Sequence, residues 1–275
     1  MTTIIESGIQ FLAWLAENSA NPLKVLDDAL FPDGLGNKHT VEINGDPGSG
    51  KTHLLAQLIA SCILPPEYNG SGINVLLINA DNRFPIRKLA RIMTNLVKMS
   101  LIKKSESLSD TKLNEIVKLS LKNLLIINCL EYYQFNCNIF SLPTMLGANN
   151  KIGIVAVDSI CAFYWQDRQV NRIEQYSLSS YVSFVLKKIQ QSTAQFKVKI
   201  IFTKPADYES LKIRPLLENA TNCERTFGEI NHRIGLTYDV NSTHGICKVQ
   251  SAKGSKTINY KITDVGIKWL DVAQS

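Results

Sequence analysis

Gly45-Asp46-Pro47-Gly48-Ser49-Gly50-Lys51-Thr52 is the stretch that decides the fold. It matches the pattern G-x-x-x-x-G-K-[ST] and lies between an apolar run, Val41–Asn44, and a helical pattern, Lys51–Cys62. Glycines at these positions let backbone N–H groups surround phosphates, and the N-terminus of the following helix adds a favourable dipole. Lys51 is expected to offer a positive charge to the outer phosphates, and Thr52 a hydroxyl to Mg²⁺. Residues 45–52 (the P-loop) therefore predict a nucleotide site, and a ligand-free Gly-rich turn is the alternative.

The segments around the P-loop predict an α/β fold in one domain, residues 1–275. Near-continuous apolar runs predict further strands at Val75–Asn79, Leu124–Asn128, Ile152–Val157 and Val198–Thr203. Such runs are typical of a parallel sheet that helices cover on both faces. After Ile230 the stretches HRIGLTYDV, GICKVQSA and TINYKIT predict antiparallel strands at the C-terminal end. A helix is expected at Ile9–Glu17, and the polar segment Lys103–Glu115 is expected to be a loop or linker.

Composition indicates an ordinary globular protein, because 45% of the residues are hydrophobic and 20% are charged. No signal peptide or membrane-spanning segment is predicted. The six cysteines form no CxxC pair, so we expect reduced thiols in an intracellular protein. The net charge of +6 is uneven, with 2 basic and 7 acidic residues through residue 50 but 11 basic and 6 acidic residues from 197 to 261. This asymmetry fits either attraction to a polyanion such as DNA or a solvated lysine-rich surface.

Two aspartates follow predicted strands and are candidates for the chemistry of the site. Asp158 ends the run that begins at Ile152, where it is expected to hold Mg²⁺ through water. Its alternative role is to cap the following helix. Asp81 follows Val75–Asn79, and we expect it beside the P-loop strand, where its carboxylate can orient an attacking water. The alternative for Asp81 is a turn aspartate.

Together these motifs resemble the ATPase core of RecA-type recombinases. The resemblance rests on the P-loop, on Leu77-Ile78-Asn79-Ala80-Asp81-Asn82-Arg83-Phe84 and on Val157-Asp158-Ser159, in that order. A likeness to the short recombinase paralogues within this family is carried by Glu6-Ser7-Gly8, Cys62-Ile63-Leu64-Pro65, the stretch from Asp158 to Trp165 and the β-rich end from His232 to Trp269. It spans nearly the whole chain, and the P-loop and the DSxxAFYW stretch are its specific parts.

The resemblance implies a RecA-like P-loop ATPase core that takes ATP and Mg²⁺. It further implies a protein of the nucleus, and also of the cytoplasm, that belongs to a complex of recombinase paralogues, with the D-type paralogue as neighbour. That complex would support the strand-exchange recombinase on single-stranded or branched DNA, during double-strand break repair by homologous recombination. Residues 1–38 are expected to form an N-terminal helix and lead-in, with no separate N-terminal DNA-binding domain.

The chain departs from the working recombinases at positions that matter for ATP hydrolysis. Asp81 stands where they have a glutamate, which would withdraw the carboxylate by one methylene. Thr203-Lys204-Pro205 stands where they end a core strand with a glutamine that senses the terminal phosphate, and proline has no amide side chain. No Phe-x-x-Ala polymerisation tether occurs. We therefore expect weak or absent hydrolysis. An active DNA-dependent ATPase is the alternative, and a P-loop kinase is disfavoured because we find no arginine-rich lid.

Two segments correspond by position to DNA-facing loops, residues 166–175 and 206–230. Their cations, which would pair with phosphates, are Arg168, Arg172, Lys212, Arg214 and Arg225. Solvated loops without a ligand are the alternative. Tyr164 and Trp165 are expected to be packing residues rather than a base-stacking platform. Trp14, in the opening helix, is expected to dock a partner or to join the core.

Overall fold

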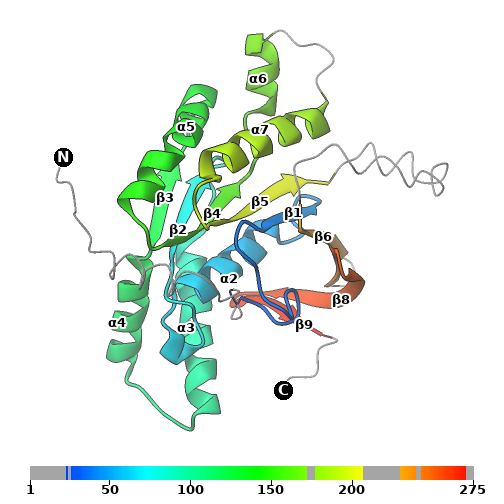
Figure 1. The fold of residues 1–275 in the computed structure, drawn as a ribbon. Helices are drawn as coiled ribbons and strands as arrows, with labels where there is room; N and C mark the ends of the chain where they lie inside the picture. Colours follow the sequence, from blue (N-terminus) through cyan, green and yellow to red (C-terminus); the bar gives the residue numbers. More distant parts are fainter. Residues whose placement is uncertain (1–22, 24–25, 172–176, 207–229, 240–242, 271–275) are drawn as a thin grey trace.

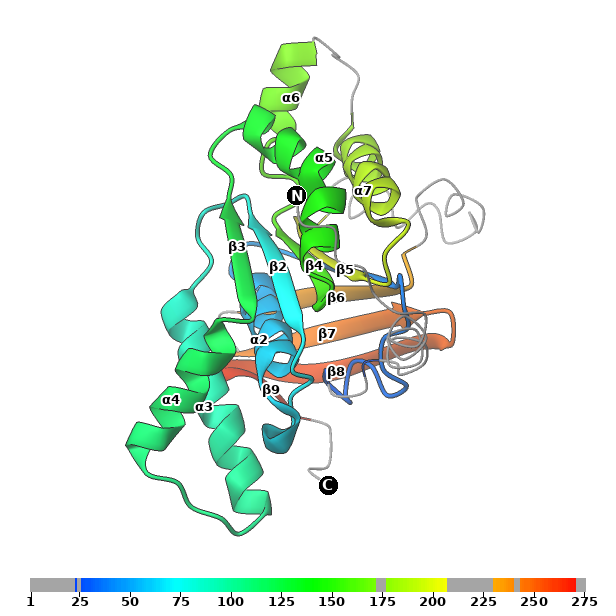
Figure 2. The ribbon, with the colours of Figure 1, turned by 60° about the vertical axis from the view of Figure 1, so that its left-hand side comes forward.

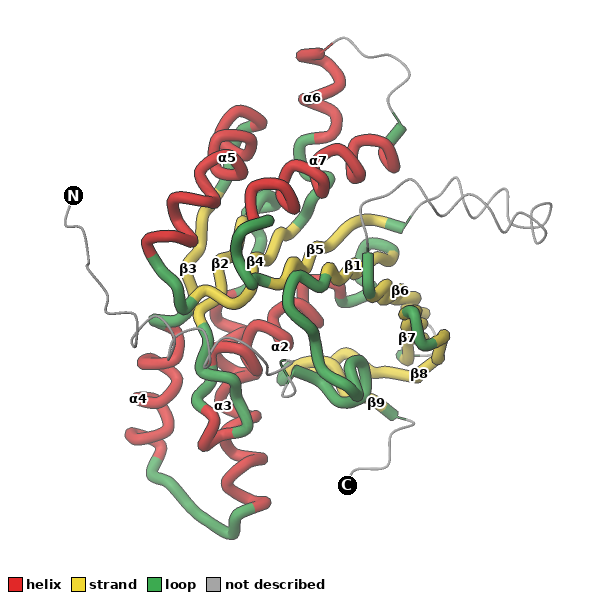
Figure 3. Tube along the Cα trace, viewed as in Figure 1, coloured by secondary structure: helices red, strands yellow, loops and turns green. Residues whose placement is uncertain are grey.

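The structure is a computed structural model that describes residues 23, 26–171, 177–206, 230–239 and 243–270 (Figure 1). Figure 3 distinguishes its helices from its strands. Their order is β1 (Thr40–Gly45), α2 (Lys51–Ile63), the 3-10 turn η1 (Pro66–Tyr68), β2 (Asn74–Asn79), α3 (Ile86–Lys103), α4 (Asp110–Leu121), β3 (Leu124–Asn128), α5 (Tyr132–Ala148), β4 (Ile152–Asp158), α6 (Tyr164–Asn171), α7 (Leu178–Thr193), β5 (Lys199–Pro205), β6 (His232–Asp239), β7 (His244–Ser251), β8 (Gly254–Thr263) and β9 (Gly266–Trp269).

The strands form one nine-stranded sheet in the order β3-β2-β4-β5-β1-β6-β7-β8-β9. The pairings from β3 to β6 are parallel, and those from β6 to β9 are antiparallel. Strand β1 lies between β5 and β6, so Val41 is opposite both Ile201 and His232. This arrangement confirms the predicted α/β class, with a mostly parallel sheet and antiparallel strands at the C-terminal end.

Helices cover both faces of the parallel part of the sheet. In Figure 1, α2, α3 and α4 lie on one side, and α5 and α7 lie on the other. Because side chains alternate between the faces of a strand, β2 sends Val75 and Leu77 into the first hydrophobic cluster and Leu76 and Ile78 into the second. Figure 2 shows the same layers from the side of β3. The continuous apolar runs of the sequence are therefore explained by burial on both faces.

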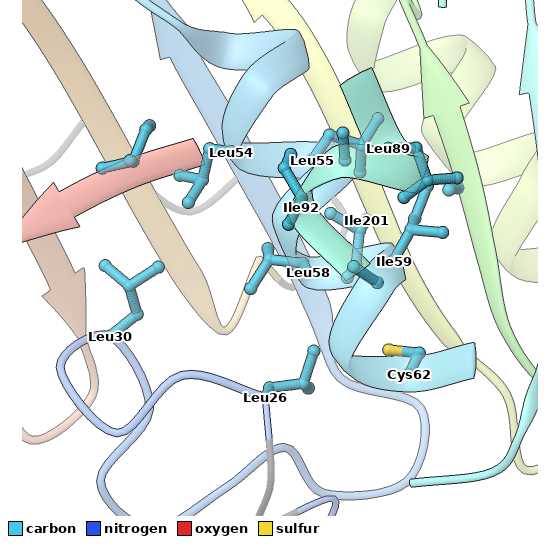
Figure 4. Close-up of a cluster of buried hydrophobic side chains, with 14 of the residues drawn as sticks. Leu26, Leu30, Leu54, Leu55, Leu58, Ile59, Cys62, Leu89, Ile92 and Ile201 are labelled. Carbon is cyan, nitrogen blue, oxygen red and sulfur yellow. The ribbon is translucent and has the colours of Figure 1, made fainter. Parts of the chain in front are cut away.

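Helix α2 is the centre of the first cluster. The leucines and isoleucines of α2, such as Leu58, point toward α3 and toward the lead-in segment before β1. Figure 4 shows Leu58 together with Ile92 of α3 and Leu30 of the lead-in segment. The antiparallel strands complete this cluster, because alternate residues of β7 such as Cys247 and Val249 are buried against it. The start of the P-loop helix is therefore fixed by packing from the C-terminal strands as well as from α3.

The prediction that Lys103–Glu115 is a loop or linker is wrong for the second half of this segment. Helix α3 extends to Lys103, but α4 already begins at Asp110. The side chain of Ser109 accepts a hydrogen bond from the amide of Lys112 and so caps α4. Leu113 is buried against the first cluster, which gives the helix an apolar side despite its polar sequence.

Other expectations concern the chain as a whole. The predicted helix Ile9–Glu17, with Trp14, lies outside the described residues. No disulfide joins the five cysteines in the part of the chain that the structure describes. Among the described helices, none combines the length and the apolar character that crossing a bilayer requires.

Candidate nucleotide-binding site

The P-loop connects the end of β1 to the start of α2 at the carboxyl edge of the sheet. Gly48 has φ 81°, and a Cβ placed there would meet no atom within 4 Å, so its backbone borders open space. The hydroxyl of Ser49 is buried and has no hydrogen-bond partner among the described residues. The accessible backbone of Gly48 and the unpaired hydroxyl of Ser49 are groups that can donate hydrogen bonds to the oxygens of a phosphate. The residues present therefore suit the group that the motif predicts.

Lys51, the first residue of α2, folds back over the P-loop. Its Nζ donates to the carbonyls of Gly45 and Asp46, at 2.8 Å in both cases. Burial lowers the pKa of Lys51, and the carboxylates of Asp158, Asp46 and Asp81 oppose that shift. The Lys51 ammonium is partly desolvated, and its present acceptors are loop carbonyls. It can therefore exchange these carbonyls for the oxygens of a phosphate.

Asp158 ends β4 and faces the start of α2. Its Oδ2 accepts from the Thr52 hydroxyl at 2.9 Å, and its Oδ1 accepts from the hydroxyl of Thr203 at the end of β5. Burial raises the pKa of Asp158, whereas the hydrogen bonds from Thr203 and Thr52 lower it. The structure therefore brings together Thr52 and Asp158, the two predicted Mg²⁺ ligands. Their hard oxygens suit Mg²⁺ shared with phosphates, and the described residues include no larger metal-binding cluster.

Asp81 is close to this site, although not in the predicted way. Strands β4 and β5 separate β2 from β1, so the expectation that Asp81 lies beside the P-loop strand is wrong. The amide of Asp81 instead donates to the carbonyl of Asp158 at 3.0 Å, and the charge of Asp81 acts on both Asp158 and Lys51. The contact arises because the carboxyl ends of parallel strands meet at one edge. The Asp81 side chain is exposed.

Pro205 ends β5 opposite Gly45, the first residue of the P-loop. The residue before it, Lys204, places its Nζ 3.5 Å from Oε1 of Glu42, which also accepts from the Asn44 side chain at 2.7 Å. Sequence reasoning did not identify Glu42 or Asn44 as neighbours of the site, and it noted Thr203 only as part of Thr203-Lys204-Pro205, without its contact to Asp158. Polar residues inside an apolar strand were the available signal, and they became interpretable only with the strand order.

Of the predicted DNA-contacting residues, only Arg168 can be placed. Arg172, Lys212, Arg214 and Arg225 lie outside the described residues. The guanidinium of Arg168 is 5.7 Å from the ring centroid of Trp165. Tyr164 is buried as expected, but Trp165, expected to pack, leaves 67% of its surface exposed although its ring centroid is 4.9 Å from that of Tyr164. An exposed tryptophan beside an arginine is therefore present at the start of α6.

Comparison with known proteins identifies relatives among DNA-repair proteins. The chain is 34% identical to the DNA repair protein XRCC2 of Mus musculus over 165 residues, which cover 59% of this chain and 54% of that protein. It is 23% identical to the XRCC2 homolog of Arabidopsis thaliana over 62% of this chain and 55% of that protein. A RAD51 homolog 3 of Dictyostelium discoideum is 24% identical over 48% of this chain and 35% of its own length. No family model matches the chain.

A solved structure of the RadB recombinase has the same fold. It superposes with a TM-score of 0.61 and covers 89% of this chain and 96% of its own, at 16% sequence identity. The predicted resemblance to RecA-type recombinase paralogues is confirmed by these similarities. The matched region spans about half of each XRCC2 protein.

Proposed function

We propose that this chain binds ATP with Mg²⁺ at the P-loop and acts as a binding and scaffolding subunit in DNA repair by homologous recombination. The observation that carries the proposal is the meeting of Thr52 and Asp158, 2.9 Å apart, at the start of the P-loop helix. Two elements far apart in the sequence place a hydroxyl and a carboxylate beside the phosphate loop. That is the arrangement that a Mg²⁺–nucleotide complex needs.

Each residue of the site has a separate task in this proposal. The amides of the P-loop and of the first turn of α2 surround the phosphates, and Lys51 moves its Nζ from the loop carbonyls to the outer phosphates. Thr52 and Asp158 hold Mg²⁺, directly and through water. When bound, Mg²⁺ neutralises phosphate charge. Thr203 keeps the carboxylate of Asp158 oriented, because its hydroxyl occupies the other carboxylate oxygen.

Weak or absent hydrolysis is supported by two side chains. Asp81 is exposed and one methylene shorter than the glutamate of the working recombinases, so its carboxylate is withdrawn from an in-line water. Pro205, next to the P-loop in the sheet, has neither a side-chain amide nor a backbone N–H with which to sense a terminal phosphate. In this proposal ATP acts by binding to the folded chain and stabilising it, and not by being hydrolysed.

The names of the relatives support the biological setting. Proteins called DNA repair protein XRCC2 and RAD51 homolog 3 are similar to this chain, so we assign it to a complex of recombinase paralogues, with the D-type paralogue as neighbour. Its proposed substrate is single-stranded or branched DNA, and its proposed place is the nucleus, with a cytoplasmic fraction. Arg168 beside the exposed Trp165 is the described feature that suits a DNA strand.

An active DNA-dependent ATPase is the second candidate. It is favoured by one observation, the position of Asp81, whose charge acts on both Lys51 and Asp158. A carboxylate so close to the site can orient water if DNA or a partner moves it inward.

ATP binding and turnover by the purified chain, alone and with its paralogue partner, distinguish these functions. We expect Mg²⁺-dependent binding that K51A weakens at least tenfold, with negligible turnover with or without single-stranded DNA, and unchanged partner binding. The matched control is K98A, which removes an exposed lysine from α3 and should bind ATP as the wild type does. DNA-stimulated turnover that K51A abolishes would establish the ATPase instead. Absence of nucleotide binding by the wild type, both alone and in the complex, would refute both.

A further inference from the structure

A tyrosine from the C-terminal strands contacts the backbone of the P-loop. Tyr260 of β8 is completely buried, and its hydroxyl donates to the carbonyl of Ser49 at 2.6 Å. The ring fits because the opposite residue on β7 is Gly245, where a Cβ would stand 2.3 Å from Cζ of Tyr260. The antiparallel strands therefore provide a fitted space for one side chain that ends at the phosphate loop.

Two isoleucines lie beside Gly50, the next residue of the P-loop. A Cβ added at Gly50 would lie 3.1 Å from Cδ1 of Ile262 on β8 and 3.6 Å from Cδ1 of Ile267 on β9. The amide of Ile267 also donates to Oε1 of Gln57 at 2.8 Å, which ties β9 to helix α2. Strands β8 and β9 thus contact both the loop and the helix that follows it.

The hydrogen bond to Ser49 determines where the next amide points. The Ser49 carbonyl and the Gly50 N–H belong to one planar trans peptide, so they point in opposite directions. Tyr260 holds the carbonyl on the protein side, and the N–H therefore points away from β8. The amide of Gly50 forms no hydrogen bond within the described part of the chain. Gly50 also has φ 95°, a conformation in which other residues are strained.

We propose that Tyr260 is a positioning residue of the P-loop, whose hydroxyl fixes the Ser49–Gly50 peptide so that the Gly50 amide faces a phosphate oxygen. The proposal rests on the proposed nucleotide binding, and it assigns to the C-terminal strands a part in the site. Ile262 supports the same peptide by contact with Gly50. Without the hydroxyl, this peptide can rotate, and the amide must be ordered when the ligand binds.

Equilibrium binding of the fluorescent analogue N-methylanthraniloyl-ATP with Mg²⁺ to the full chain tests this role. Y260F removes one oxygen and keeps the ring, and we expect it to raise the Kd about 3- to 10-fold, as for one lost hydrogen bond. The matched control is Y238F, because the Tyr238 hydroxyl donates to the Thr243 carbonyl within the hairpin of β6 and β7. We expect Y238F to bind within about twofold of the wild type. An equal Kd for Y260F and Y238F would overturn the proposal.

Hydrogen–deuterium exchange of the nucleotide-free chain separates positioning from nucleotide binding. We expect faster exchange of the amides at residues 48–52 in Y260F, and in I262V to a smaller extent, but not in Y238F. If the wild type binds no nucleotide while Y260F still accelerates this exchange, the proposed function fails and the positioning role stands. If exchange at 48–52 is unchanged in both Y260F and I262V, the positioning role is wrong. I262V keeps the test valid should Y260F fail to fold.

Discussion

The carboxylate of Asp158 is under two opposing influences. Burial favours its protonated form, whereas hydrogen bonds from the hydroxyls of Thr203 and Thr52 favour its charged form, and the net effect is a raised pKa. Because the folded chain binds this proton more tightly than the unfolded chain, Asp158 lowers stability as the pH rises through its folded pKa. Mg²⁺ needs the charged form, so metal binding and stability depend on pH in opposite directions.

The variant T203V should alter this balance. It removes the hydroxyl from Oδ1 of Asp158, so the pKa of Asp158 should rise further. On lowering the pH, Mg²⁺-dependent ATP binding should therefore be lost at a higher pH than in the wild type. At neutral pH the free energy of unfolding should fall by about 1–3 kcal/mol, because a buried charge loses a donor. Nucleotide titrations across a pH series and chemical denaturation measure both effects.

The control for T203V is T193V, because the buried hydroxyl of Thr193 donates to the carbonyl of Ile189 inside α7. T193V should leave the pH dependence of ATP binding unchanged. The same pH profile in T203V and the wild type would show that Thr203 does not influence Asp158.

At the level of elements, α2 carries both the P-loop and the centre of the first cluster. Leu55 is 0% exposed, so L55A should lower the free energy of unfolding by about 2–5 kcal/mol. Leu119 on α4 is 60% exposed, and L119A should change the free energy of unfolding by less than about 0.5 kcal/mol. Urea denaturation of both variants checks this difference. Similar losses in both would contradict the assigned packing of α2.

How well an element could be predicted depended on how uniform its sequence is. Strand β3 has the predicted bounds, Leu124–Asn128, because every residue before its final asparagine is apolar. Helix α4 was missed because its buried residues, such as Leu113 and Val117, begin inside a segment in which charged and polar residues predominate. Its capping residue, Ser109, is one of several serines in that segment and could not be distinguished from a loop residue.

The site was predictable where a motif is continuous in sequence and not where it depends on strand order. The P-loop residues and Asp158 come from local patterns, and the structure places Thr52 and Asp158 in contact. The position of Asp81 was mispredicted because two strands that occur later in the chain insert between β2 and β1. The contact between Tyr260 and Ser49 spans 211 residues, and no local pattern indicates such a pair.

For the whole molecule, the antiparallel strands are expected to be necessary for folding. Deleting residues 230–275 removes the β6 neighbour of β1 and uncovers the leucines of α2. We expect this deletion to abolish cooperative unfolding and nucleotide binding together, which circular dichroism and ATP titration measure. Replacing residues 105–107, which are exposed between α3 and α4, by Gly and Ser residues should preserve both. A deleted chain that still unfolds cooperatively would refute this requirement.

The sheet order also has a consequence during protein synthesis. Of the described strands, β1 is the first to leave the ribosome, yet its neighbours are β5 and β6, which pair with it through contacts such as Thr40 with Ile200 and Val41 with His232. Strands β2, β3 and β4 can pair with one another earlier, because they are closer in the chain. Until translation has passed β6, β1 has at most one of its two neighbours, so at least one of its edges is unpaired and open to association with other chains. Strand β1, made before β2, β3 and β4, therefore gains its second neighbour only after all three have been made.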